Sequence, residues 1–124
     1  SADQVFSEHH LNYLTALVGT GPAYPALLSR SLFTDAVNNG LPPAIAQRAA
    51  HAVVVNASKL IGNGHPVDEL LQALISYRGV TAAGLDAMIS HGFDKTIKAG
   101  LDAATSVACS MSHFVHSADT KKVQ

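Results

Sequence analysis

The stretch FDKTIKAGLDAATSVACSMSHFVH, residues 93–116, carries the most regular pattern in this sequence and decides its fold class. Apolar residues in it alternate four and three positions apart, which is the heptad spacing of a helix that buries one face. We call this set the C-terminal seam, and its members are Ile97, Leu101, Ala104, Ala108, Met111 and Val115. The spacing predicts a long helix whose C-terminal seam packs within the domain or against a second subunit. The polar residues after His116 predict a loose tail.

Helix start and stop signals divide the sequence upstream of this helix. Ser7 is a suitable N-cap for a helix that runs towards Leu17, and Gly19-Thr20-Gly21 interrupts that helix. Pro22 can then occupy the first turn of a second helix, which ends at Asn38-Asn39-Gly40. These signals predict two helices before residue 41.

Three further helices are predicted between this point and the 93–116 helix. The first begins at Pro42-Pro43 and ends at Gly62-Asn63-Gly64. The second begins at Pro66 and ends before Ser76. The third begins with Thr81 as its cap and ends at His91-Gly92. No segment alternates with a period of two, so no strand is expected. The predicted fold class is all-α, a helical bundle of about five to six helices, and residues 1–124 form a single domain.

The composition is poor in charge and rich in apolar residues. Charged residues make up 14% of the 124 residues and hydrophobic residues 48%, whereas soluble domains carry about 25% charged residues. Part of the apolar surface is therefore expected to be covered by another copy of the chain or by another domain. No apolar run reaches the roughly 20 residues of a membrane span. The net charge of −1 does not indicate the basic surface that a nucleic-acid-binding protein needs.

Several kinds of reactive site are disfavoured by the residue pattern. His113 and His116 share one helix face, but no third ligand has metal-site spacing, so no metal is expected. Gly19-Thr20-Gly21 lacks the preceding strand and the third glycine of a dinucleotide fingerprint. The lone Cys109 is typical of a packing thiol in a reducing compartment.

The break between Ser76 and Thr81 is the best candidate for chemistry. A helix N-terminus presents backbone N–H groups that attract carboxylates, and the two hydroxyls would add donors, making a small anion pocket. An ordinary capped turn explains the same residues, and the local pattern alone favours this simpler interpretation.

Six short motifs, in order and in register, resemble those of the C-terminal domain of pyrroline-5-carboxylate reductases. Gly19-Thr20-Gly21-Pro22-Ala23-Tyr24 resembles Gly-Ser-Gly-Pro-Ala-Tyr, and it is followed by Gly40-Leu41-Pro42, by Ala57-Ser58-Lys59-Leu60 and by His65-Pro66. The segment from Ser76 to Leu85 is similar to Ser-Pro-Gly-Gly-Thr-Thr-Ile-Ala-Gly-Leu, and Gly92-Phe93 is similar to Gly-Phe. The likeness runs from about Leu14 to Ser110.

This resemblance implies a fold and an activity. The fold would be the interlocked dimerisation domain of these reductases, like the C-terminal domain of 6-phosphogluconate dehydrogenase. The activity would be transfer of a hydride from NAD(P)H to the C=N bond of a cyclic imine acid, giving proline or a related amino acid. A separate N-terminal Rossmann domain, absent from this chain, would hold the NADP or NAD. We therefore expect a cytoplasmic homodimer or higher oligomer, and we expect the isolated chain to be inactive.

The resemblance also assigns site residues. Thr81 would be catalytic, placed near the imine nitrogen and able to help deliver its proton, and Thr15 would lie near the nicotinamide. The substrate-binding residues would be Ser76, Arg78, Gly79, Val80, Thr81 and, in the pocket wall, Pro22.

The chain departs from the family pattern where Tyr77-Arg78 replaces Pro-Gly. Arg78 could clamp a carboxylate with two hydrogen bonds or could face water. The departure predicts a related but altered imine acid, or a reduced activity. The alternative function is a stand-alone helical oligomerisation or binding module without catalysis. A second alternative is a helical metal-binding protein that uses His113 and His116.

Overall fold

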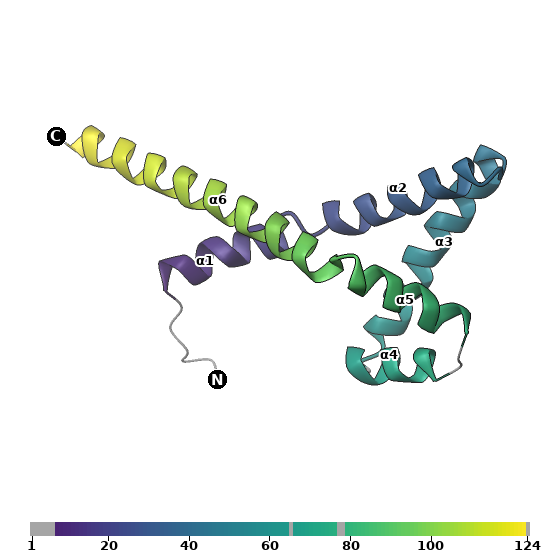
Figure 1. Cartoon of the computed structure of the whole chain (residues 1–124). Coiled ribbons are helices and arrows are strands. Elements are labelled where there is room, and N and C mark those ends of the chain that lie inside the picture. The colour runs from purple at the N-terminus through teal and green to yellow at the C-terminus, as the bar shows by residue number, and fades with distance from the viewer. Residues whose placement is uncertain (1–6, 65, 77–78, 124) are drawn as a thin grey trace. The chain divides into compact units, whose positions relative to one another are not determined.

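The computed structural model of the chain describes residues 7–64, 66–76 and 79–123, with side chains as far as His113. Every regular element in this part of the chain is a helix (Figure 1). In order, the elements are α1 (Glu8–Leu14), the π-helical turn η1 (Thr15–Gly19), α2 (Ala23–Asn38), α3 (Pro43–Gly62), α4 (Val67–Ile75), α5 (Val80–Ser90) and α6 (Phe93–Val123). The predicted all-α fold class is confirmed.

The helices form two compact units. The first unit combines Ser1–Gly21 with Gly92–Gln124, and within it α1 and η1 pack against α6 (Figure 1). The second unit is Pro22–His91, where α2 packs against α3 and α4 packs against α5. The organisation of residues 1–124 as a single domain stays a prediction.

The helix ends follow most of the expected signals. The Ser7 hydroxyl accepts a hydrogen bond from the backbone N–H of His10, and the His10 ring accepts one from the Ser7 N–H, so a capping box starts α1. Gly40 has φ +95°, a conformation that glycine adopts without steric cost, and it ends α2 where the sequence predicts. Pro43 occupies the first turn of α3.

Two helix ends differ from those that the sequence predicts. The N-cap of α5 is Gly79, and Thr81 lies inside the first turn, because the positive φ of Gly79 lets the helix begin two residues earlier than a threonine cap would. The backbone of α6 continues as a helix to Val123, past His116, after which the sequence predicts a tail.

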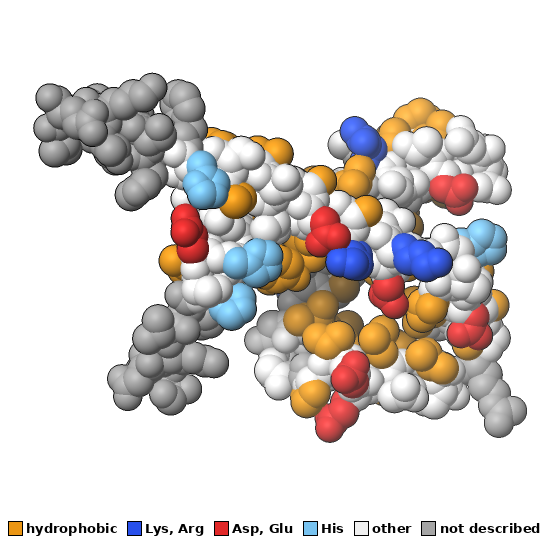
Figure 2. All heavy atoms as spheres, turned by 60° about the vertical axis from the view of Figure 1, so that its left-hand side comes forward, with side chains coloured by type: hydrophobic (Ala, Val, Ile, Leu, Met, Phe, Trp, Pro, Cys, Tyr) orange, Lys and Arg blue, Asp and Glu red, His pale blue; other side chains and the backbone are white. Residues whose placement is uncertain are grey.

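The structure buries very few apolar side chains. Among the described residues, the buried hydrophobic ones are Ala16, Ala46 and Ala50, and no large side chain is fully buried. Hydrophobic side chains reach the surface over much of the visible face (Figure 2). In the C-terminal seam, Ile97 is 46% exposed and Met111 is 63% exposed. Each unit by itself therefore leaves apolar surface in water that a folded protein usually covers.

The contact between α2 and α3 depends on small side chains. Ala46 is 0% exposed and Ala50 is 5% exposed, so the Ala46→Leu substitution has no room without separating the helices. We expect it to lower the free energy of unfolding by about 1–3 kcal/mol, measured by urea unfolding at fixed protein concentration. Ala44→Leu, on the exposed face of α3, is the matched control and should change it by less than about 0.5 kcal/mol. Equal effects would contradict this packing.

Candidate functional site

The start of α5 presents the backbone groups that the sequence analysis singled out. Gly79 has φ 82° and ψ −106°, and the first helical hydrogen bond runs from the Ala83 N–H to the Gly79 carbonyl over 2.9 Å. The N–H groups of the first turn have no partner within an α-helix, and no side chain in the described part of the chain caps this terminus. The first turn of α5 is therefore able to receive a carboxylate, which the helix dipole also favours.

Four of the residues predicted to bind substrate lie at the end of α4 and the start of α5: Ser76, Gly79, Val80 and Thr81. Ser76 is the C-cap of α4, and its hydroxyl donates to the Ala73 carbonyl at 2.9 Å. Val80 is 91% exposed, and the Thr81 side chain is also exposed. Tyr77 and Arg78 lie outside the described residues, so the structure says nothing about a carboxylate clamp by Arg78.

Gly79, Val80 and Thr81 lie together at the start of α5, whereas Pro22 and Thr15 belong to other elements. Pro22 is the N-cap of α2, whose packing partner is α3, so the described helix contacts do not join it to α5. Thr15 belongs to the first unit, where it begins η1 and donates a hydrogen bond to the Leu11 carbonyl at 3.0 Å. The roles of these residues stay predictions.

Charged and metal-binding groups add little to the site. Across residues 7–64, 66–76 and 79–113, no three His, Cys, Asp or Glu side chains come together as metal ligands. The ion pair between Lys98 and Asp102, 2.9 Å long, lies on the exposed surface of α6 and contributes little to stability. Among the described helices, none is long and apolar enough to cross a membrane.

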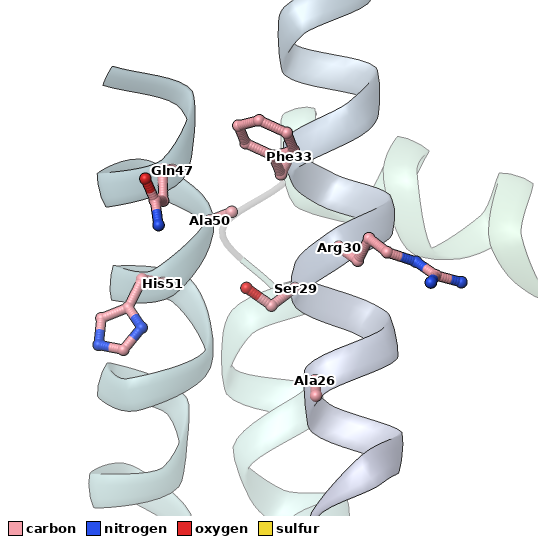
Figure 3. Close-up of a pocket in the computed structure, with 7 residues that line it drawn as sticks. All are labelled: Ala26, Ser29, Arg30, Phe33, Gln47, Ala50 and His51. Carbon is pink, nitrogen blue, oxygen red and sulfur yellow. The ribbon is translucent and has the colours of Figure 1, made fainter. Parts of the chain in front are cut away.

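An open hollow of about 390 Å³, which the sequence does not predict, lies between α2 and α3. Its lining residues are Ala26, Ser29, Arg30, Phe33, Gln47, Ala50 and His51. Figure 3 shows the Arg30 side chain pointing away from α3, so its charge does not converge with the polar groups of Gln47 and His51. The hollow thus lacks the convergent polar groups of a ligand site. The only sign of it in the sequence is His51, a polar residue in an apolar stretch.

The backbone of Gly79 gives the site its own testable property. A residue with a side chain is strained at φ 82° and ψ −106°, so Gly79→Ala should lower the free energy of unfolding by about 1–3 kcal/mol. Gly62→Ala, in an ordinary helical conformation with nothing within 4 Å of an added Cβ, should be neutral or stabilising by up to about 1 kcal/mol. Urea unfolding of both variants compares them. Equal stability would show that the turn before α5 does not hold this conformation.

Comparison with known proteins agrees with this arrangement of helices. A family model described as pyrroline-5-carboxylate reductase dimerisation matches residues 8–111. A pyrroline-5-carboxylate reductase of Synechocystis is 34% identical over 99 residues, which are 78% of this chain and 37% of the relative. One of Lophium arboricola is 35% identical over 94 residues, which are 76% of this chain and 29% of the relative.

A solved structure supports the same relationship. The crystal structure of Plasmodium falciparum pyrroline carboxylate reductase with NADP bound superposes with a TM-score of 0.75 at 27% identity, covering 86% of this chain and 41% of that one. The chain thus spans less than half the length of these relatives. Because the family model matches from residue 8 to 111, this chain belongs to the pyrroline-5-carboxylate reductase dimerisation family.

Proposed function

We propose that this chain is the dimerisation and substrate-binding part of an NAD(P)H-dependent reductase that converts a cyclic imine acid into proline or a related amino acid. The family match over residues 8–111 is the observation that carries this proposal. The chain covers 37% of the Synechocystis relative, so we assign nucleotide binding mainly to a separate N-terminal domain. On this proposal the isolated chain is inactive.

The first turn of α5 has the chemistry to hold the substrate. The backbone N–H groups of Val80 and Thr81 would bind the substrate carboxylate, and the dipole of the 11-residue helix favours a negative charge there. This anchoring would orient the C=N bond, and orientation accounts for much of the rate in such reactions.

The Thr81 hydroxyl is proposed to act at the imine nitrogen. Its side chain is exposed at the second position of α5, where it can hydrogen-bond to a group bound at the helix terminus. When bound, NAD(P)H supplies a hydride to the imine carbon, and the nitrogen takes up a proton as the C=N bond becomes a single bond. Thr81 would hold that nitrogen and pass the proton from solvent. Thr15 is the residue of this chain that we place beside the nicotinamide.

A second copy of the chain is the proposed partner. Ala16, Ala46 and Ala50 are the buried hydrophobic residues of the described part, while Ile97 and Met111 stay about half exposed. A homodimer would cover such surface, as the name of the family indicates. A cytoplasmic location also stays a prediction, motivated by the lone Cys109.

Kinetics of the complete gene product test the proposal. The open reading frame that contains this chain should be expressed, and oxidation of NADPH or NADH followed with pyrroline-5-carboxylate and with larger and smaller cyclic imine acids. We expect turnover by the full-length protein and none by the isolated chain. A well-folded dimer that reduces none of these substrates would refute the reductase and favour a binding module.

The same substrate panel tests the departure from the family motif at Tyr77-Arg78. The double variant Tyr77→Pro/Arg78→Gly restores the residues of the family motif. If these two residues select a related imine acid, this variant should shift preference towards pyrroline-5-carboxylate. An unchanged preference would show that Tyr77 and Arg78 do not set specificity.

A further inference from the structure

A π-helical turn interrupts the first helix where the sequence predicts a continuous α-helix. η1 spans Thr15–Gly19 and follows α1 directly. A π turn hydrogen-bonds five residues back, so it accommodates an extra residue. Such turns are rare and occur frequently at functional sites. η1 begins at the residue proposed to face the nicotinamide and ends at the Gly19-Thr20-Gly21 corner.

Packing and a side-chain hydrogen bond hold this turn. Ala16 is 2% exposed, in the segment where η1 packs against α6. The Thr20 hydroxyl donates to the Ala16 carbonyl, the acceptor that the Thr20 backbone N–H would use in an α-helix. That N–H is directed to the Val18 carbonyl instead. The hydroxyl therefore links Thr20, the residue after η1, to Ala16 inside it.

Gly21 holds the turn by having no side chain. Its N–H donates to the Val18 carbonyl at 3.1 Å. A Cβ added at this position would lie 3.1 Å from the Val18 carbonyl oxygen and 3.3 Å from that of Leu17. Both neighbours are backbone atoms, so they cannot move aside as a flexible side chain would. The close approach of the corner to the π turn thus requires glycine here.

We propose that η1 is a positioning element of the reductase site, and that Thr20 and Gly21 are positioning residues that set the direction of Thr15. The proposal rests on the proposed function. Each residue of an α-helix turns the chain by about 100°. If η1 changed into an α-helical turn, it would no longer accommodate the extra residue. Thr15 would then be rotated by about this angle relative to the corner at Gly21. Thr20 and Gly21 act through Thr15 and need not touch the nucleotide or the substrate.

Kinetics of three variants of the full-length enzyme test the positioning role. Thr20→Val keeps the shape but removes the hydroxyl, Gly21→Ala adds the clashing Cβ, and Thr20→Ser keeps the donor. We expect the first two to lower kcat about tenfold or more, because a displacement of about 1 Å can cost roughly 10²-fold in rate. KM for the imine acid should change less than about twofold, since the carboxylate is bound at α5. Thr20→Ser should stay within about twofold of wild type.

The matched control is Ser58→Ala. Its hydroxyl donates to the Val54 carbonyl at 2.9 Å inside the regular helix α3, so its loss should leave kcat unchanged. Wild-type kcat in both Thr20→Val and Gly21→Ala would overturn the proposal. Equal losses in Thr20→Val and Thr20→Ser, or losses explained by dissociation of the dimer, would also overturn it.

A second measurement does not depend on activity. Scalar couplings across hydrogen bonds, recorded by NMR on the labelled 124-residue chain, report which carbonyl each amide contacts. We expect couplings five residues apart in η1 of the wild type and four residues apart in Thr20→Val. An unchanged pattern in the variant would overturn the holding role of Thr20. If the wild-type enzyme reduces no imine acid, the proposed function and the positioning role fail together, while the couplings still decide whether Thr20 holds the turn.

Discussion

Ile97→Asp should abolish self-association of this chain at micromolar concentration. Ile97 belongs to the C-terminal seam and is 46% exposed in α6, so a second copy is free to cover it. An aspartate there would place an unpaired charge in an apolar contact, which costs several kcal/mol. We expect the dissociation constant to rise at least about 100-fold, equivalent to about 3 kcal/mol. Sedimentation velocity over a range of concentrations measures this change.

A charge on the opposite, polar side of the same helix is the matched control. That side carries four exposed residues at four-residue spacing: Lys98, Asp102, Ser106 and Ser110. Ser106→Asp should therefore leave the dissociation constant within about threefold of wild type. If Ser106→Asp disrupts association and Ile97→Asp does not, the contact between copies lies on the polar face of α6 and not on the C-terminal seam.

Thr81→Ala should lower kcat/KM of the full-length reductase by about 10²-fold or more. Positioned proton transfer contributes roughly 10²–10⁴-fold to such reactions, and alanine removes the hydroxyl that we place at the imine nitrogen. Thr81 is exposed in the first turn of α5, and alanine is the better helix former. The loss should therefore occur without a loss of stability, which urea unfolding of the same sample checks.

Two further substitutions separate the hydroxyl from other effects. Thr81→Ser keeps a hydroxyl at the same position and should retain activity within about tenfold of wild type. Thr34→Ala removes an exposed threonine from α2 and should leave kcat/KM unchanged. Retention of most activity by Thr81→Ala would assign proton delivery to another group and leave α5 as a carboxylate anchor only.

Helix boundaries were predictable where a single residue determines the backbone. Ser7 caps α1, Gly40 ends α2 and Pro43 starts α3, each through a property of one side chain or its absence. The start of α5 was missed because Gly79 and Thr81 are both plausible caps in the sequence. The positive φ of Gly79, which only the structure shows, decides between them.

Features that depend on wider helix geometry were not predictable from periodicity. The apolar pattern between Ser7 and Leu17 fits an α-helix, yet η1 replaces its last turn. The close approach at Gly21 and the bond from the Thr20 hydroxyl accompany this turn, and periodicity contains neither. The C-terminal seam was recognised from spacing alone. Whether it meets its own domain or a second copy is a property of tertiary contacts that a periodic pattern does not contain.

Candidate site residues were found through order and spacing of motifs rather than through any one motif. Gly79, Val80 and Thr81 meet at the start of α5 because they are adjacent in sequence. Thr15 and Pro22 come from other elements, so their roles depend on contacts that local pattern cannot specify.

The central claim is that this domain completes its fold only with a second copy of itself, and the 124-residue chain tests it directly. Sedimentation equilibrium combined with circular dichroism at a series of concentrations measures association and folding together. We predict a dimer whose melting temperature falls on dilution, with helix lost as the dimer dissociates, since buried side chains as small as Ala16, Ala46 and Ala50 cannot sustain a core. A helical monomer with a concentration-independent, cooperative melting transition would contradict the claim.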